Sequence, residues 1–219
     1  MISTKEKVSD VRDWFRKLKE KEEFVTDKSG CKMLEVVGAT FIADEPQVFG
    51  TINHDYIKRE IEWYKSTSRN VNDIPGGAPS EWIKCATKEG KINSNYGWMI
   101  YSKENYSQYE NVLKELTTKQ DSRRASMIYT RPSMWIDYNV EGMSDFVCTN
   151  VVQYFVRDKK LIALVQMRSN DLVFGYKNDF AWQNFVHESL ATDIGVEKGK
   201  MIWHAGSFHI YERHFNLIK

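Results

Sequence analysis

Residues 148–168 read CTNVVQYFVRDKKLIALVQMR, and this stretch decides the fold. Two apolar, β-branched runs, 149–157 and 161–167, flank the polar triplet Asp158-Lys159-Lys160. The pattern predicts two strands joined by a tight turn, because polar turn residues between apolar runs are typical of a β-hairpin. Folding the hairpin about its turn sets Cys148 roughly opposite Arg168. The sequence therefore predicts a thiol and a guanidinium side by side.

The chemistry of Cys148 depends on that cation. The pKa of an unperturbed cysteine is about 8.5, so only a few per cent of the thiol is ionised at neutral pH. A nearby guanidinium raises the thiolate fraction and activates the sulfur as a nucleophile. A free cysteine without such a neighbour is usually a buried apolar group, so Arg168 is what makes Cys148 a candidate catalytic residue.

The rest of the chain mixes helix and strand patterns. Apolar spacing predicts a first helix that Ser3 caps and that includes Val8, Val11 and Phe15, and further helices over 53–66, 106–116 and 180–192. Strand patterns cover 33–43, 127–130, 134–138 and 201–211, and the Pro- and Gly-rich segment 74–79 is a loop. Because strands and helices do not alternate regularly, we expect an α+β fold with one large sheet backed by helices.

Length and composition indicate one globular domain over residues 1–219. The chain has 219 residues, of which 42% are apolar, and no Pro-, Gly- or Ser-rich linker divides it. The 31 basic and 30 acidic side chains leave a net charge of +1, which argues against direct nucleic-acid binding. A local cluster of cations is enough for a single nucleotide, so we expect a small ligand.

Cysteine usage and hydropathy indicate the compartment. Cys31, Cys85 and Cys148 leave one cysteine over in any pairing and lack metal-site spacing, as expected in a reducing cytoplasm. The N-terminal residues MISTKEK lack the apolar core of a signal peptide, and no run approaches the roughly 20 apolar residues of a membrane span. His204, His209 and His214 have a five-residue spacing that fits no usual zinc site. We therefore expect a cytoplasmic protein with no metal and no membrane contact.

Cations and hydroxyl donors occur together in two runs. Arg123 and Arg124 are adjacent, so on a strand they would point to opposite faces, and both reach one ligand only from a loop or a partner subunit. Arg168 with Ser169 adds a guanidinium fork and a hydroxyl, a combination suited to phosphate oxygens. An isolated arginine is usually a surface ion pair worth less than about 1 kcal/mol, so the combination indicates the phosphate ligand.

In these motifs the sequence resembles the thymidylate synthase family. The matching features are the spacing from Cys148 to Arg168 and the runs 121–124 (DSRR), 168–171 (RSND) and 209–211 (HIY). Weaker matches follow in the same order at 27–30, Glu60 with Trp63, Trp82, 96–97, Gly175 and 178–179, so the resemblance covers nearly the whole chain. It implies a thymidylate synthase-like fold with a mixed sheet, one face of which forms a homodimer interface.

Within the family, the sequence looks closest to the members from bacterial viruses that hydroxymethylate deoxycytidylate. This likeness lies in 128–134 (IYTRPSM), 143–146 (MSDF) and 167–171 (MRSND). It implies transfer of a one-carbon unit from 5,10-methylenetetrahydrofolate to carbon 5 of dCMP, followed by addition of water, for the synthesis of modified viral DNA.

Asp179 is the residue that favours cytosine. Aligned on Arg168 and Gly175, it falls where uracil-using members carry an asparagine that reads the base edge. An amide donates and accepts, as uracil requires, whereas a carboxylate only accepts and pairs with the cytosine amino group. Rejection of the wrong base through unpaired buried groups reaches about 10⁴-fold. The alternative is that Asp179 caps a helix beginning at Phe180.

The resemblance also implies roles for the remaining residues. Cys148 attacks carbon 6 of the pyrimidine, Glu60 orders water and relays protons, and Tyr96 lies near the thiol. The 5′-phosphate is held by Lys28, Arg168, Ser169 and, from the second subunit, Arg123 and Arg124. His209 and Tyr211 hold the deoxyribose, and Asn170 and Asp171 belong to the same nucleotide-binding set. The folate is contacted by Trp82, Asp171 and Glu60.

Other functions stay open on the sequence alone. The nearest are a dUMP-using thymidylate synthase and a dCMP C5-methylase. A hydrolase built on Cys148, His209 and Asp171 fits the cation cluster poorly. A non-enzymatic alternative is a nucleotide-binding subunit of a viral nucleotide-synthesis complex. Family members also close their site with a segment beyond the 209–211 strand, whereas this sequence ends at Lys219, so either a tail is missing from it or another segment closes the site. A hydroxymethylase must admit water, so a reduced lid is compatible with that activity.

Overall fold

The computed structural model describes residues 2 and 4–219. By their contacts these residues form two compact units. Unit 1 comprises the chain up to Ile52 together with Tyr154–Lys219, and unit 2 comprises Asn53–Gln153. That residues 1–219 act as one catalytic domain stays a prediction.

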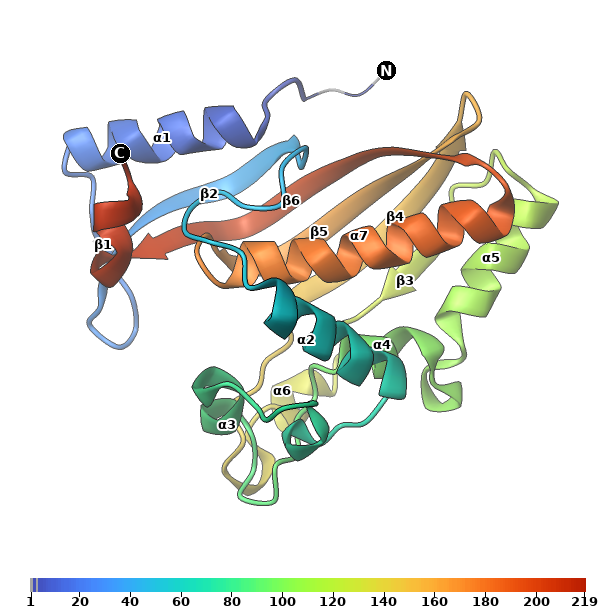
Figure 1. The fold of residues 1–219 in the computed structure, drawn as a ribbon, viewed down its shortest axis with the longest axis horizontal. Coiled ribbons are helices and arrows are strands. Elements are labelled where there is room, and N and C mark those ends of the chain that lie inside the picture. Colours follow the sequence, from blue (N-terminus) through green and yellow to red (C-terminus); the bar gives the residue numbers. More distant parts are fainter. Residues whose placement is uncertain (1, 3) are drawn as a thin grey trace. The chain divides into compact units, whose positions relative to one another are not determined.

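The described strands lie in one sheet with the order β1-β2-β6-β5-β4-β3 (Figure 1). Their bounds are β1 Val25–Thr26, β2 Lys32–Ile42, β3 Ser126–Ile128, β4 Thr149–Arg157, β5 Lys160–Asp171 and β6 Glu197–Tyr211. β5 and β6 are parallel, whereas β1 with β2, β2 with β6 and β3 with β4 are antiparallel. The predicted α+β fold with a mixed sheet is confirmed, and its use as a dimer interface stays a prediction.

The hairpin predicted from residues 148–168 is present. β4 and β5 are neighbours in the sheet and are joined by Asp158 and Lys159, whose φ angles are 51° and 59°. Two successive residues with positive φ give a turn whose twist matches that of the strands, as is usual in two-residue hairpin loops. Lys160, expected in the turn, is the first residue of β5.

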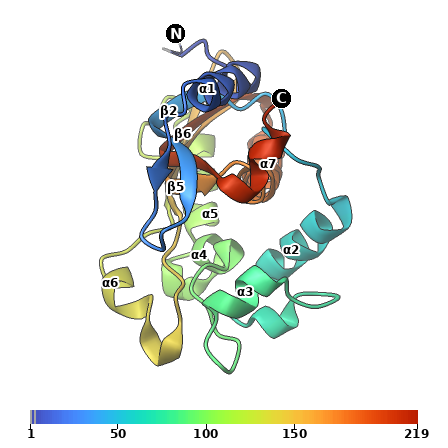
Figure 2. The same ribbon diagram turned by 90° about the vertical axis from the view of Figure 1, so that its left-hand side faces the viewer.

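In unit 1, α1 (Val8–Glu20) and α7 (Gly175–Ile194) cover the same face of the sheet formed by β2, β6 and β5 (Figure 2). Phe15 of α1 and Tyr176 of α7 both contact Phe208 of β6, with ring centroids 6.3 and 5.9 Å apart. All three rings are fully buried. This aromatic cluster holds both helices against the sheet, because buried edge-to-face rings add to the free energy gained from apolar burial.

The ends of these helices differ from the sequence expectation. α1 begins at Val8, and the Asp10 carboxylate accepts a hydrogen bond from the amide of Lys7 (2.7 Å), which is the N-cap residue. Ser3, the predicted cap, lies outside the described residues. α7 begins at Gly175 rather than at Phe180. Beyond β6 the described chain forms a 3-10 helix, η4 (Glu212–Leu217).

Unit 2 is mainly helical. Besides β3 and the first part of β4, its elements are α2 His54–Ser66, η1 Val71–Asp73, α3 Ser80–Cys85, α4 Tyr96–Tyr101, η2 Lys103–Asn105, α5 Gln108–Thr118, α6 Met134–Asp137 and η3 Val140–Gly142. α2 packs on α4, and Gly97 permits this close approach because a Cβ there would lie 1.8 Å from the Tyr64 carbonyl oxygen. Among the described residues, no helix combines the length and apolar content that crossing a membrane requires.

The predicted strand 134–138 is wrong, because Met134–Asp137 forms the short helix α6. The Asp137 carboxylate accepts from the Ser133 hydroxyl at 2.8 Å and from Arg131 Nε at 3.3 Å. Such local contacts, made within about one turn, favour helical over extended backbone. Trp135 and Ile136 are 73% and 72% exposed, so the apolar residues that predicted a strand do not pack into the sheet.

Candidate active site

The residues expected to form the active site are found in each unit, and in unit 2 they include Glu60 of α2. Glu60 is 4% exposed. The Tyr56 hydroxyl donates to Glu60 Oε1 at 2.5 Å, and the Trp82 indole N–H donates to the same oxygen at 3.0 Å. Trp82 Nε1 also lies 2.9 Å from the Tyr56 hydroxyl. Unit 2 thus brings together two predicted residues, Glu60 and Trp82, and adds Tyr56.

Burial controls the protonation of Glu60. Loss of solvent raises the pKa of this carboxyl group, while the hydrogen bonds from Tyr56 and Trp82 act in the opposite direction. Burial and the nearby carboxylate also raise the pKa of the Tyr56 hydroxyl. The net effect on the pKa of Glu60 is upward. A carboxyl group with a raised pKa holds and passes on a proton closer to neutral pH, as a proton relay requires.

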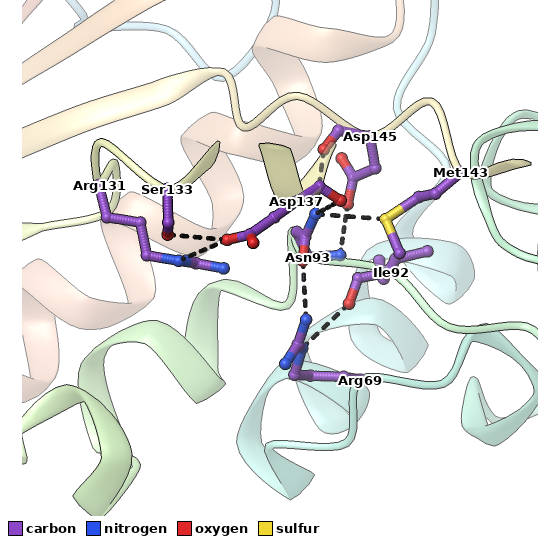
Figure 3. Close-up of polar contacts among 8 residues, drawn as sticks. All are labelled: Arg69, Ile92, Asn93, Arg131, Ser133, Asp137, Met143 and Asp145. Atoms are coloured by element: carbon purple, nitrogen blue, oxygen red, sulfur yellow. Dashed lines mark hydrogen bonds and ion pairs between the residues drawn. The ribbon is translucent and has the colours of Figure 1, made fainter. Parts of the chain in front are cut away.

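Asp145 anchors the segment that leads to Cys148 (Figure 3). The buried Asp145 carboxylate accepts from the amides of Asn93 and Ser94, both at 2.7 Å, and from the Ser94 hydroxyl at 2.5 Å. Three residues later, the partly exposed Cys148 thiol lies 3.8 Å from the Phe146 carbonyl oxygen. A fixed backbone ahead of an accessible thiol suits a nucleophile that must keep one position.

Tyr96 is held by aromatic neighbours at the start of α4. Its ring is 4% exposed, stacks on Tyr64 with centroids 5.3 Å apart, and meets Tyr129 edge-on at 5.2 Å. Ser94, two residues before Tyr96, is hydrogen-bonded to Asp145, three residues before Cys148. These bonds connect the segment before Tyr96 to the segment before Cys148. That Tyr96 lies near the thiol and assists proton transfer stays a prediction.

Arg123 and Arg124 lie in the loop between α5 and β3, not on a strand. Arg124 is 72% exposed and pairs with Glu115 at 2.9 Å. The Ser122 hydroxyl donates to the same carboxylate at 2.6 Å, and this bond together with Arg124 lowers the pKa of Glu115. The Arg123 carbonyl oxygen accepts from Gln153 Nε2 at 2.7 Å. From a loop, both arginines can reach the same ligand, as the sequence-based prediction required. That they bind the phosphate in the active site of a second subunit stays a prediction.

In unit 1 the predicted sugar-binding residues, His209 and Tyr211, lie at the end of β6, beside the end of β5. Asp171 of β5 is the register partner of His209 on β6, and the ring centroids of His209 and Tyr211 are 5.2 Å apart. Burial lowers the pKa of His209, against the opposing effect of the Asp171 carboxylate, so the imidazole is neutral at neutral pH. Burial raises the pKa of Tyr211. A neutral imidazole beside a protonated phenol is suited to hydrogen bonds with a sugar hydroxyl.

Lys28 lies at the tip of a rigid turn between β1 and β2. Asp27 organises this turn, because its Oδ1 accepts from the Ser29 hydroxyl at 2.7 Å and from the amides of Ser29 and Cys31 at 2.8 and 2.9 Å. The hydrogen bond from the Ser29 hydroxyl is the main reason that the pKa of Asp27 is lowered. Lys28 itself is exposed, which suits the predicted contact with a phosphate.

The two oxygens of Asp171 serve different purposes. Oδ1 accepts from the amides of Val173 and Phe174 at 3.0 and 2.6 Å, and these bonds fix the chain just before α7. Oδ2 is buried and has no hydrogen-bond partner among the described residues. Because a buried acceptor without a donor is costly, an N–H edge such as that of a pterin would fit here.

Asn170 and Asp179 lie side by side. Asn170 is 3% exposed, and its Nδ2 donates to Asp179 Oδ2 at 2.7 Å. Asp179 is four residues past the start of α7 at Gly175, so the alternative that it caps a helix beginning at Phe180 is wrong. A Cβ at Gly175 would lie 3.0 Å from Asn170 Nδ2, so glycine leaves room for this pair. Asn170 therefore orients the Asp179 carboxylate.

Arg168 and Ser169 lie on β5 immediately before Asn170. A Cβ at position 206 would lie 2.8 Å from the Arg168 carbonyl oxygen, so only glycine lets β6 approach this closely. Ser169 is in register with Ser207. The predicted position of Arg168 opposite Cys148 and the phosphate contacts of both residues stay predictions.

Three neighbours of the predicted residues were missed by sequence reasoning, namely Tyr56, Ser207 and Glu35. Tyr56 precedes Glu60 by one helical turn, and this i, i+4 spacing was a usable signal. The Ser207 hydroxyl donates to the Glu35 carboxylate and lies 3.1 Å from His209 Nδ1, which makes that nitrogen the donor. Glu35 reaches this position through the register of β2 with β6, which the sequence does not disclose.

Comparison with known families agrees with this geometry. The thymidylate synthase family model matches residues 13–219. The chain belongs to the thymidylate synthase family, as its motifs predicted.

The relatives separate two groups within that family. Deoxycytidylate 5-hydroxymethyltransferase of Enterobacteria phage T4 is 52% identical over 100% of this chain and 92% of its own length. The protein of the same name from Enterobacteria phage T2 gives the same values. The thymidylate synthases of Francisella philomiragia and Buchnera aphidicola are 24% and 26% identical over 88% of this chain, covering 76% and 75% of their own length. The chain is thus about twice as similar to the phage hydroxymethyltransferases, which confirms the expected group.

Proposed function

We propose that this protein transfers a one-carbon unit from 5,10-methylenetetrahydrofolate to carbon 5 of deoxycytidine 5′-monophosphate and adds water, giving 5-hydroxymethyl-dCMP. The observation that carries the proposal is the 52% identity, over the whole chain, with phage enzymes named for this activity. The bacterial thymidylate synthases among the relatives are only 22 to 26% identical to it.

The base-reading residue agrees with a cytosine substrate. Asp179 presents a carboxylate that Asn170 orients through a 2.7 Å hydrogen bond. A carboxylate accepts from the exocyclic amino group of cytosine, whereas uracil offers a carbonyl at that place and would be repelled. We assign the choice of base to Asp179, with Asn170 as its positioning residue.

Covalent catalysis by Cys148 begins the proposed reaction. Its thiolate adds to carbon 6 of the pyrimidine, which makes carbon 5 nucleophilic. Carbon 5 bonds to the one-carbon unit and loses its proton, and departure of the folate leaves an exocyclic methylene. Water adds to this methylene, and cleavage of the C6–S bond restores the ring and the thiolate. Glu60, whose pKa burial raises, is assigned the proton transfers and the ordering of water.

The residues assigned to the folate suit its shape and polarity. When bound, methylenetetrahydrofolate supplies the one-carbon unit at the oxidation level of formaldehyde. The Trp82 indole N–H is hydrogen-bonded to Glu60 and Tyr56, which holds the partly buried ring as an apolar wall. Asp171 Oδ2, the buried acceptor without a partner among the described residues, is assigned to the N–H edge of the pterin.

The phosphate-binding set includes residues from two subunits. We assign Lys28, Arg168 and Ser169 of one subunit to the 5′-phosphate, with Arg123 and Arg124 donated by the second. The 72% exposure of Arg124 and the 78% exposure of the apolar Val37 on β2 agree with surfaces that a second copy covers. Sedimentation equilibrium is expected to give twice the chain mass, and a monomer that turns over dCMP contradicts the shared site.

A product assay tests the function. The protein is incubated with dCMP or dUMP and methylenetetrahydrofolate, and the nucleotides are separated by mass. We expect dCMP to gain one CH₂O unit while tetrahydrofolate is released. Formation of thymidylate from dUMP with dihydrofolate would identify a synthase, methylated dCMP would identify a methylase, and no turnover of either nucleotide would favour a binding subunit.

A further inference from the structure

Unit 2 contains a cavity of about 760 Å³ that shares no residue with the proposed reaction. Its wall carries the cations Arg69, Lys91 and Arg131 around Trp98, together with the carboxylates Asp137 and Glu141. Small-molecule sites usually enclose about 300–1,000 Å³, so the cavity has room for a ligand of nucleotide size.

Arg69 is fixed at this cavity by neutral groups. Its Nε donates to the Ile92 carbonyl oxygen at 3.1 Å, and its Nη2 donates to Asn93 Oδ1 at 2.7 Å. The guanidinium lies 4.4 Å from the centre of the Trp98 ring, a cation–π distance. Asn93 is itself held by Asp145, so the guanidinium rests on a rigid support (Figure 3).

A second guanidinium faces the same ring. Arg131 lies 5.4 Å from the Trp98 ring centre, so the guanidinium groups of Arg69 and Arg131 both lie beside this indole. Arg131 has a carboxylate neighbour, since its Nε lies 3.3 Å from Asp137, which also accepts from Ser133. Two cations beside one ring repel each other, and their repulsion is relieved by an anion between them.

The charges at the cavity leave an excess of cations. Among the described residues, no carboxylate lies within 4.0 Å of the Arg69 guanidinium or of the Lys91 ammonium. Burial, and then the charge of Arg131, lower the pKa of Arg69. A guanidinium has five N–H donors, of which Arg69 uses two on Ile92 and Asn93, so three remain for a ligand.

We propose that this cavity binds a small phosphate ester, with the phosphate held between Arg69 and Arg131 and beside Lys91. Three cations against two carboxylates leave the wall with an excess of positive charge that favours an anion, and a guanidinium fork pairs with two phosphate oxygens at once. The cavity exceeds the size of a phosphate, so the remainder of the ligand lies against the Trp98 ring.

Isothermal titration with inorganic pyrophosphate tests the proposal without any turnover. The parent protein is expected to bind pyrophosphate saturably. Lys91→Ala removes an exposed side chain, and Arg69→Gln removes the fixed guanidinium; each is expected to weaken binding by about tenfold or more, since a hydrogen bond to a charged group is worth about 1.5–3 kcal/mol. Lys88→Ala, an exposed lysine three residues from Lys91 and outside the cavity wall, is the matched control and is expected to bind normally.

The outcomes are decisive because each variant reports on one site. Arg168→Ala is expected to bind pyrophosphate as the parent does. If this variant loses binding while Lys91→Ala binds normally, pyrophosphate occupies the nucleotide-phosphate site and the proposal is overturned. Absence of saturable binding by the parent also overturns it. So does glutarate binding as tightly as pyrophosphate, which would mean that the cavity prefers carboxylates. Should Arg69→Gln fail to fold, Lys91→Ala alone carries the test.

Discussion

Asp179→Asn is the substitution that most directly exposes how the base is chosen. In the structure Asn170 Nδ2 donates to Asp179 Oδ2 at 2.7 Å. An asparagine at position 179 keeps this bond only if its carbonyl oxygen faces Asn170. Its NH₂ group then occupies the place of the other carboxylate oxygen. The contact with Asn170 therefore dictates that the variant offers a donor, not an acceptor, to the base.

The size of the effect follows from the groups left unpaired. With dCMP, the amide NH₂ would face the cytosine amino group, so two donors meet and neither finds an acceptor. Each buried polar group without a partner costs about 1–3 kcal/mol, so the pair costs about 2–6 kcal/mol, which is roughly 30-fold to 10⁴-fold in kcat/KM. With dUMP, the same NH₂ group gains the carbonyl oxygen O4 as acceptor.

The assay is a competition between dCMP and dUMP for the variant and the parent, with products resolved by mass. We expect the ratio of kcat/KM for dCMP over dUMP to fall by at least about 30-fold in Asp179→Asn. Asp193→Asn, at the exposed far end of the same helix, is the matched control and is expected to keep the parental ratio. A parental ratio in Asp179→Asn would refute the assignment of base reading to this residue.

Three further predictions concern the thiol, its anchor and the proton relay. Cys148→Ser is expected to abolish turnover while its circular dichroism spectrum and melting temperature stay equal to those of the parent. Turnover above about 10⁻³ of the parental rate would mean that the sulfur is not the nucleophile. Asp145→Ala leaves three donors of Asn93 and Ser94 without their acceptor. It is expected to lower the free energy of unfolding, measured by urea denaturation, by about 3 kcal/mol or more. A loss below about 1 kcal/mol would mean that Asp145 does not anchor this segment. Because burial raises the pKa of Glu60, the folded protein binds that proton more tightly than the unfolded chain, so this group's contribution to stability falls as pH rises above the ordinary carboxyl value of about 4.3. Glu60→Gln is therefore expected to become more stable relative to the parent as pH rises above about 4.3, measured as the free energy of unfolding in urea. If the difference in this free energy between variant and parent does not change with pH, the raised pKa of Glu60 is contradicted.

The parts of the fold that the sequence predicted are those set by local pattern. The strands of the 148–168 hairpin follow from apolar runs on either side of a polar turn, and Asp158 and Lys159 adopt the positive φ that such a turn needs. The helix over 53–66 follows from apolar spacing, and Asn53 caps it by accepting from the Tyr56 amide at 3.0 Å. Both signals lie within a few residues of the element that they define.

The misjudged elements depend on contacts that pattern does not carry. Residues 134–138 contain apolar side chains that stay exposed, so burial could not enforce the strand that their composition indicated. The start of α7 is fixed by Asp171, which lies on the preceding strand and binds amides two and three residues ahead. A cap supplied from a strand end leaves no Ser, Thr, Asp or Asn at the helix N-cap, which is Phe174.

The candidate site likewise has residues that sequence motifs predicted and contacts that only the tertiary structure explains. Glu60 and Trp82 were found through family motifs, and the structure adds the shared Tyr56 that the i, i+4 spacing could have revealed. The contact between Asn170 and Asp179 joins a strand to a helix and is set by tertiary packing, so only the structure explains how the carboxylate is oriented. Motifs thus predict which residues act, and packing determines which atom of each is presented.

The most direct measurement of the central claim is a trapping experiment with 5-fluoro-dCMP. Fluorine at carbon 5 cannot leave as a proton does, so a reaction that adds a thiolate to carbon 6 and a one-carbon unit to carbon 5 stops at a covalent complex. After incubation with 5-fluoro-dCMP and methylenetetrahydrofolate, mass spectrometry of the intact protein and of its peptides is expected to show one nucleotide and one folate per chain, bound through Cys148. An unmodified protein that nevertheless turns over dCMP, or an adduct on Cys31 or Cys85, would contradict nucleophilic catalysis by this thiol.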